Sequence, residues 1–127
     1  MEDWELDFEW VRIKHIVKDA LGRDVLPDFQ TILFLIGIQE LGLIQHDFTK
    51  EEKQDLMHIA VCRLLAYDDY YEFIGRDGDG WPHYKAIKDV PIDGVKEQEL
   101  FLKKYVIRYF KDLEIENGGF EGHVKQV

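Results

Sequence analysis

Serine is absent from this 127-residue chain, and cysteine occurs once, as Cys62. The absence of serine excludes catalysis by a Ser-His-Asp triad. The single cysteine excludes an internal disulfide and any zinc or iron–sulfur site built from several cysteines. No linker rich in serine or threonine divides the chain, and its length fits one domain. We therefore predict a single globular domain over residues 1–115, followed by a flexible tail over residues 116–127.

Positive charge is scarce, since 16 basic residues face 26 acidic ones and leave a net charge of −10. Such a charge repels nucleic-acid phosphates and anionic membrane surfaces. The longest uncharged apolar run, residues 32–38, is too short to cross a bilayer. Five acidic residues precede the first basic residue, Arg12, which is unlike a secretory signal. We expect a cytoplasmic protein that binds neither nucleic acid nor membrane.

Apolar periodicity predicts a first helix over residues 4–21 and a second over residues 27–41. Asp3 is expected to cap the first helix and Gly22 to end it. Pro27 is expected to be the first residue of the second helix, because its fixed φ suits that position.

The centre of the second predicted helix, residues 32–38, is apolar on all sides. A helix of this kind belongs in the middle of a bundle or in an oligomer interface, which makes self-association a possibility to test. Gly37 interrupts this run, although glycine lowers helix stability by about 1 kcal/mol relative to alanine. We therefore expect another backbone to pass close to Gly37.

The first predicted helix has a second apolar stripe, formed by Trp4, Phe8 and Val11, which we expect to adjoin the first. So broad an apolar surface indicates contact with two neighbouring elements. The helix start is also strongly acidic and could imitate a phosphate backbone to occupy a basic protein. The acidic residues are Glu2, Asp3, Glu5, Asp7 and Glu9.

A capping box, Thr49-Lys50-Glu51-Glu52, predicts the start of a third helix over residues 50–67. A fourth helix is predicted over residues 94–113, capped by Asp93. Between them, aromatic and branched residues flank a tip with two Asp-Gly pairs, which predicts a β-hairpin over residues 70–87. The predicted fold class is therefore mainly α: a compact four-helix domain with a β-hairpin between helices three and four.

Asp55, His58 and Cys62 are spaced three and four residues apart, so they share one face of the third predicted helix. Carboxylate, imidazole and thiolate are ligands for a transition metal, and His58 could also act as a base toward a Cys62 nucleophile. A buried cysteine beside a hydrogen-bonded histidine explains the same spacing without any chemistry. A metal-binding or metal-dependent enzyme is therefore kept as the alternative function.

Aromatic residues concentrate around the predicted hairpin. Tyrosine and tryptophan dominate protein interfaces, although cross-strand packing also uses them. The interface residues that we predict are Tyr70, Tyr71, Trp81, His83 and Tyr84.

For every candidate catalytic pair, cofactor loop or metal-ligand spacing, a purely structural role explains the same residues better. We therefore favour a non-enzymatic, acidic protein–protein interaction module without a cofactor, which has an unidentified protein partner and could also self-associate. The metal-binding alternative comes second, and the acidic nucleic-acid mimic comes third.

Overall fold

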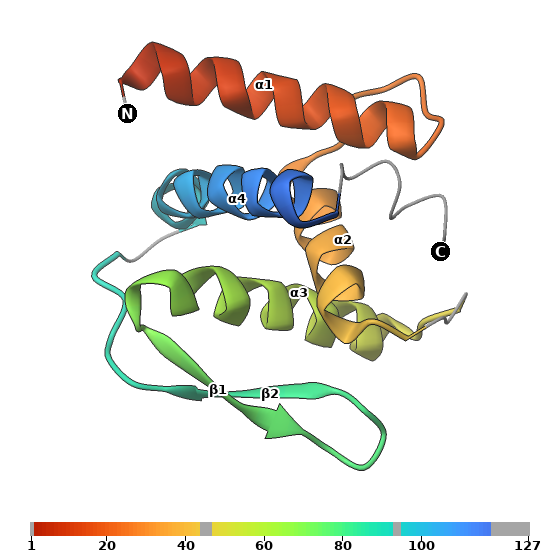
Figure 1. Ribbon diagram of the computed structural model, residues 1–127, viewed down its shortest axis with the longest axis vertical. Coiled ribbons are helices and arrows are strands. Elements are labelled where there is room, and N and C mark those ends of the chain that lie inside the picture. Colours follow the sequence, from red (N-terminus) through yellow and green to blue (C-terminus); the bar gives the residue numbers. More distant parts are fainter. Residues whose placement is uncertain (1, 44–46, 93–94, 118–127) are drawn as a thin grey trace. The chain divides into compact units, whose positions relative to one another are not determined.

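The computed structural model describes residues 2–43, 47–92 and 95–117. In these ranges the chain has four α-helices, with a two-stranded antiparallel sheet between the third and the fourth (Figure 1). This confirms the predicted mainly α fold class. The chain divides into two compact units: one contains the first and last helices, and the other contains the elements between them.

The first unit contains α1 (Asp3–Ala20) and α4 (Val95–Asn117), which pack against each other. An ion pair joins the two helices, because Arg12 Nη1 donates a hydrogen bond to Glu114 Oε1 at 3.0 Å. The Lys103 ammonium of α4 also lies 5.4 Å from the centre of the Trp10 ring of α1.

The ends of these helices differ in detail from the prediction. Asp3 does not cap α1, because it already lies in the first turn and Glu2 occupies the cap position. Gly22 ends α1 as predicted, with a φ of +65° that favours glycine. Helix α4 runs to Asn117, beyond the predicted end at residue 113. The predicted cap Asp93 and residues 118–127 of the predicted tail lie outside the described residues.

The second unit begins with α2 (Phe29–Leu41) and α3 (Lys50–Leu65). Pro27 is not the first residue of α2, because the helix starts two residues after it. The capping box of α3 is confirmed: Glu52 N–H donates to Thr49 Oγ1 at 3.1 Å, and Thr49 N–H donates to Glu52 Oε1 at 2.9 Å. A 3-10 turn, η1 (Ala66–Asp68), follows α3 directly.

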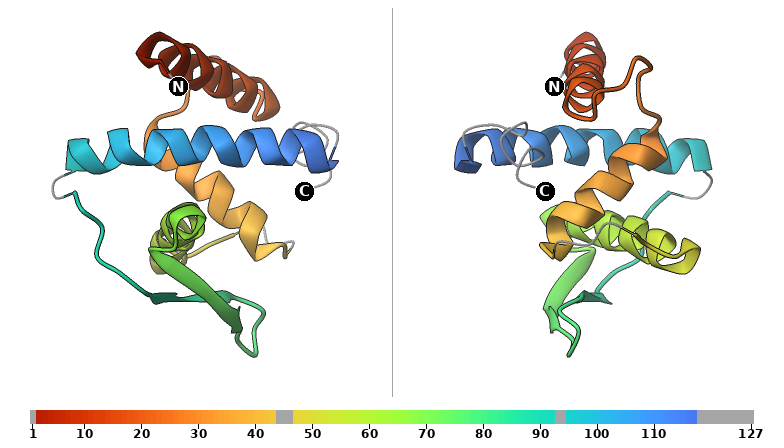
Figure 2. Two further views of the ribbon diagram at one scale, coloured as in Figure 1. Left: turned by 60° about the vertical axis from the view of Figure 1, so that its left-hand side comes forward. Right: turned by 90° about the vertical axis from the view of Figure 1, so that its right-hand side faces the viewer.

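Helices α2 and α3 cross at a steep angle (Figure 2). At the crossing, a Cβ atom placed on Gly37 would lie 2.7 Å from the carbonyl carbon of Leu56 and 2.9 Å from its Cβ. The predicted close approach of another backbone to Gly37 is therefore confirmed. No large apolar side chain of α2 is exposed, so this helix has the packed environment that its apolar sequence requires.

The hairpin consists of β1 (Tyr71–Arg76) and β2 (Pro82–Ala86), paired antiparallel with an irregularity between Phe73 and Gly75. It lies along α3, and both of its strands contact that helix (Figure 1). A small core joins the elements of this unit. In this core, Leu41, Leu56 and Ile59 are buried against Phe34, Ile38, Phe48, Trp81 and Tyr84. The hairpin is thus fixed to the helices by its own aromatic residues.

Candidate functional site

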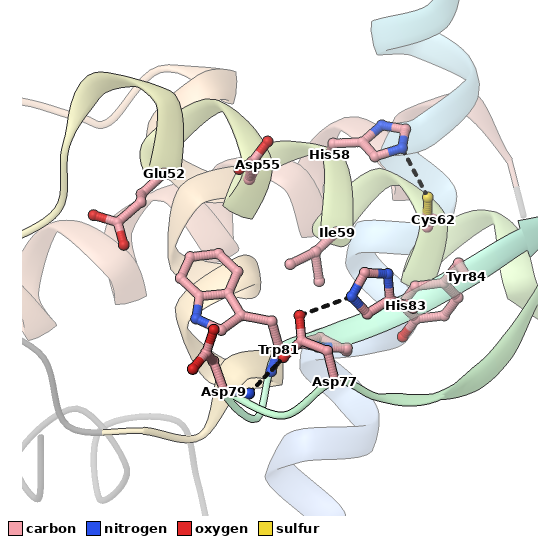
Figure 3. Close-up of a pocket in the computed structure, with 11 residues that line it drawn as sticks. Glu52, Asp55, His58, Ile59, Cys62, Asp77, Asp79, Trp81, His83 and Tyr84 are labelled. Atoms are coloured by element: carbon pink, nitrogen blue, oxygen red, sulfur yellow. Dashed lines mark hydrogen bonds and ion pairs between the residues drawn. The ribbon is translucent and has the colours of Figure 1, made fainter.

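A cavity of about 510 Å³ lies between α3 and the hairpin of the second unit (Figure 3). Five of its lining residues come from α3 and six from the hairpin and its tip. They are Glu52, Asp55, His58, Ile59, Cys62, Asp77, Asp79, Trp81, Pro82, His83 and Tyr84. The cavity is built within one unit, so its geometry depends only on how the hairpin packs on α3.

The α3 side of the cavity follows from helical periodicity. Residues at spacings of three and four share a face, which brings Asp55, His58 and Cys62 to the same wall. The capping box fixes where the helix begins, and it places Glu52 at the end of this wall. His58 and Asp55 are exposed, whereas Cys62 is buried.

The His58–Cys62 pair carries no reactive thiolate. His58 Nε2 lies 3.5 Å from Cys62 Sγ. Burial raises the pKa of Cys62 to about 11, so the thiol keeps its proton near neutral pH. A nucleophile needs the thiolate form, and this environment opposes its formation.

Asp77 organises the opposite side of the cavity, at the tip of the hairpin. Its Oδ1 accepts hydrogen bonds from the N–H groups of Asp79 at 2.9 Å and Trp81 at 3.0 Å. Its Oδ2 lies 2.9 Å from His83 Nε2, with which it forms an ion pair when the imidazole is protonated. The hydrogen bond with His83, assisted by the backbone donors, lowers the pKa of Asp77. This carboxylate therefore stays ionised.

Two aromatic rings form part of the cavity. Trp81 and Tyr84 are half-buried, and both pack on the Leu41, Leu56 and Ile59 cluster. In Figure 3 the Trp81 ring lies between Glu52 and Asp79. Desolvation, followed by the nearby charge of Glu40, raises the pKa of Tyr84 to about 12, so its phenol is neutral.

Acidic side chains predominate among the charged residues of the cavity. Four of the lining residues carry carboxylates, and among the described lining residues none is lysine or arginine. Asp55 and Asp79 have no ion-pair partner among the described residues. An acidic cavity with aromatic walls has the chemistry to hold a cation, through carboxylates and through the faces of the rings.

The two sets of predicted site residues come together in this cavity. Asp55, His58 and Cys62, predicted as metal ligands, form one wall, and Trp81, His83 and Tyr84, predicted as interface residues, form another. The described residues contain no group of three or more His, Cys, Asp or Glu side chains arranged to hold a metal ion.

The other two predicted interface residues lie elsewhere. Tyr71 packs its ring edge-on against His58, with 6.4 Å between ring centres. Tyr70 is half-buried, and the Lys88 ammonium lies 4.6 Å from the centre of its ring. Neither residue lines the cavity.

Sequence reasoning did not assign Glu52, Asp77 or Asp79 to the site. The Asp-Gly repeat predicted the hairpin tip. It did not predict that Asp77 and Asp79 would line a cavity beside α3, because this depends on how the hairpin packs on that helix. Reasoning from the sequence also missed the apolar side chains that the structure leaves most exposed on the hairpin. These are Phe73, Ile74 and Ile87, with exposed fractions of 51%, 60% and 49%.

No helix within the described ranges has the length and apolar character needed to span a membrane. No protein family, curated protein or solved structure matches this chain.

Proposed function

We propose that this chain is a protein–protein interaction module whose acidic cavity receives a positively charged side chain of the partner protein. The observation that carries this proposal is the lining itself: four carboxylates and two aromatic rings, without a lysine or arginine among the described lining residues. Arginine fits best, because its planar guanidinium both stacks on rings and pairs with carboxylates.

The energetics favour a protein ligand over a free small molecule. An exposed cation–π contact contributes about 0.5–1 kcal/mol, and each exposed ion pair contributes about 0.2–1 kcal/mol. One cation–π contact and two ion pairs, with Asp55 and Asp79, sum to about 3 kcal/mol at most, below the roughly 4 kcal/mol that corresponds to a Kd of about 1 mM. A single side chain would therefore bind weakly, and the remaining affinity must come from other contacts with the partner.

The test uses two five-residue peptides, Gly-Ser-Arg-Ser-Gly and the same peptide with citrulline in place of arginine, both with blocked ends. Citrulline keeps the shape of arginine and removes its charge. Binding is followed at millimolar peptide by the NMR resonances of the Trp81 indole N–H and the His83 ring. We expect these resonances to shift with the arginine peptide and to move far less with the citrulline peptide.

A matched pair of variants locates the binding. The double substitution Asp55→Asn/Asp79→Asn removes two carboxylates of the cavity and should weaken the response to the arginine peptide. The control, Asp24→Asn/Asp89→Asn, removes the same charge at two exposed positions outside the cavity and should leave the response unchanged. Equal responses in the two double variants, or equal responses to the two peptides, would contradict the proposal.

Zinc ions, added instead of the peptide, test the alternative function of metal binding. A stoichiometric shift of the Trp81 indole N–H resonance at micromolar zinc, abolished by His58→Gln, would replace the proposed function with metal binding.

A further inference from the structure

Helix α1 carries apolar side chains on two opposite faces, and not on two adjoining ones as predicted. One face is buried, and α1 packs against α4. The buried residues are Trp10, Ile13 and Val17. On the opposite side of the helix, Trp4, Phe8 and Val11 are 70%, 64% and 48% exposed. The second contact that the sequence predicted for this stripe is thus not made within the described residues.

The exposed stripe has the spacing of a helix–helix seam. Trp4, Phe8, Val11 and the exposed His15 follow one another at intervals of four, three and four residues. This is the spacing of the a and d positions at which two helices pack along their length. The stripe therefore suits a second helix better than a loop or a flat surface.

Charge is divided along α1 by sign. Five acidic side chains lie between residues 2 and 9, whereas the second half of the helix has the basic side chains of Arg12, Lys14 and Lys18 and a single acidic one, Asp19. Two such helices side by side in parallel would bring their acidic halves together. In an antiparallel pair, each acidic half lies beside the basic half of the other helix.

We infer that α1 pairs antiparallel with α1 of a second copy of this chain, forming a two-fold symmetric dimer. Phe8 of one copy would pack against Val11 of the second copy, and Trp4 against His15. Asp7 and Lys14 lie seven residues apart on the same flank of the stripe, so each faces its opposite in the other copy. Arg12 is already bonded to Glu9 and Glu114 at 2.9 and 3.0 Å, so the Asp7–Lys14 pairs determine the orientation.

The expected contact is small. From the exposed fractions, the two copies of Trp4, Phe8 and Val11 together bury about 700 Å². Flanking side chains bring the total to about 1,000 Å², the lower limit for a specific interface. Because each copy also has a net charge of −10, the dimer is expected to be reversible and to form at high concentration.

Sedimentation velocity of the full chain over a dilution series measures the association. Trp4→Ala/Phe8→Ala removes both aromatic anchors and should weaken dimerisation by about 30-fold or more. Val25→Ala is the control, because Val25 is 74% exposed and lies outside the stripe. Circular dichroism and the melting temperature show that each variant remains folded.

Charge exchange tests the orientation. Asp7→Lys places two lysines opposite each other, Lys14→Asp places two aspartates opposite each other, and each should weaken the dimer. The double variant Asp7→Lys/Lys14→Asp restores opposite charges in the antiparallel pair and should restore dimerisation. In a parallel pair, a lysine at residue 7 would lie beside Arg12 of the other copy, and the double variant would stay weak.

A monomeric mass at the highest soluble concentration would overturn the inference, as would a dimer that is insensitive to Trp4→Ala/Phe8→Ala. Failure of the double charge exchange to restore dimerisation would overturn the antiparallel pairing. The Asp55→Asn/Asp79→Asn variant should dimerise like the original chain, so this inference and the proposed function fail independently.

Discussion

Cys62 is a buried thiol with an unreactive environment, although it lines a cavity and contacts a histidine. Because burial raises the pKa of Cys62 to about 11, we expect it to react with a thiol-specific disulfide reagent far more slowly than a free cysteine near neutral pH. In denaturant the reaction should become fast, which serves as the internal control. A fast reaction in the folded chain would show that His58 draws the proton from the thiol.

The raised pKa values of Cys62 and Tyr84 predict loss of stability at alkaline pH. Burial raises the first from 9.0 to about 11 and the second from 10.0 to about 12. Above pH 9 the unfolded chain releases these protons before the folded chain does. The stabilisation is therefore complete below pH 9 and is lost as the pH rises toward 12.

Urea unfolding at a series of pH values measures this effect. The comparison is with Tyr84→Phe, which has no phenol to ionise at this position and keeps every other titrating group. The free energy of unfolding should fall less steeply above pH 10 in Tyr84→Phe than in the original chain. Equal slopes in Tyr84→Phe and the original chain would show that the Tyr84 phenol does not have a raised pKa.

At the scale of the elements, the crossing of α2 and α3 depends on the absence of a side chain at Gly37. Alanine favours a helix by about 1 kcal/mol over glycine, but its Cβ would collide with the backbone of Leu56. We expect Gly37→Ala to destabilise the chain by about 1–3 kcal/mol, and Gly37→Leu to do so by more.

Thermal unfolding measures the effect of the Gly37 variants. Gly78→Ala is the control, because a Cβ there has no neighbour within 4 Å and should change the melting temperature little. A higher melting temperature for Gly37→Ala would show that the two helices can separate without loss.

Arg76 joins the hairpin to the end of α2. Its guanidinium donates hydrogen bonds to the carbonyl oxygens of Glu40 at 2.8 Å, Leu41 at 2.9 Å and Gly80 at 2.8 Å. The last turn of α2 has no basic residue of its own, so Arg76 supplies the positive charge that favours a helix C-terminus.

We expect Arg76→Gln to destabilise the chain by about 2 kcal/mol, because it leaves carbonyl groups without a charged donor. Arg76→Lys should recover part of this loss, since it retains the charge but not the fork of donors. Chemical denaturation of both variants measures the difference. Equal stability of the two variants and the original chain would show that water replaces the guanidinium.

Local patterns in the sequence predicted the elements well, and their contacts with distant residues poorly. The start of α3 was predictable because Thr49 and Glu52 are only three residues apart and complete each other's hydrogen bonds. Arg76 was not, because its acceptors at Leu41 and Glu40 are 35 and 36 residues away. For the same reason, both walls of the cavity were identified separately, but their meeting was not, since it depends on how the hairpin packs on α3.

At the scale of the whole molecule, the order of elements along the chain predicts coupled folding of the two units. Helices α1 and α4 belong to one unit, although the entire second unit separates them in sequence. Bringing two distant segments together has an entropic cost that grows with the length of the intervening chain. Folding of the second unit shortens that chain and so favours the pairing of α1 with α4.

The single domain predicted from the sequence should therefore unfold in one transition. Circular dichroism at the helical band and tryptophan fluorescence should give coincident thermal curves, because Trp10 reports on the first unit and Trp81 on the second. Two separate transitions would show instead that the units fold independently.

The hydrogen bonds that order the hairpin tip have a consequence for the rate at which a partner binds. Asp77 is held by two backbone donors and His83, so the hairpin tip beside the cavity is already ordered before the proposed cationic partner binds. The negative field of the chain attracts such a partner over distances of about a Debye length, roughly 10 Å at 0.1 M salt. Added salt should therefore reduce the association rate constant much more than it alters the dissociation rate constant. Encounters would be frequent and brief, and the lifetime of each complex would depend on contacts outside the cavity.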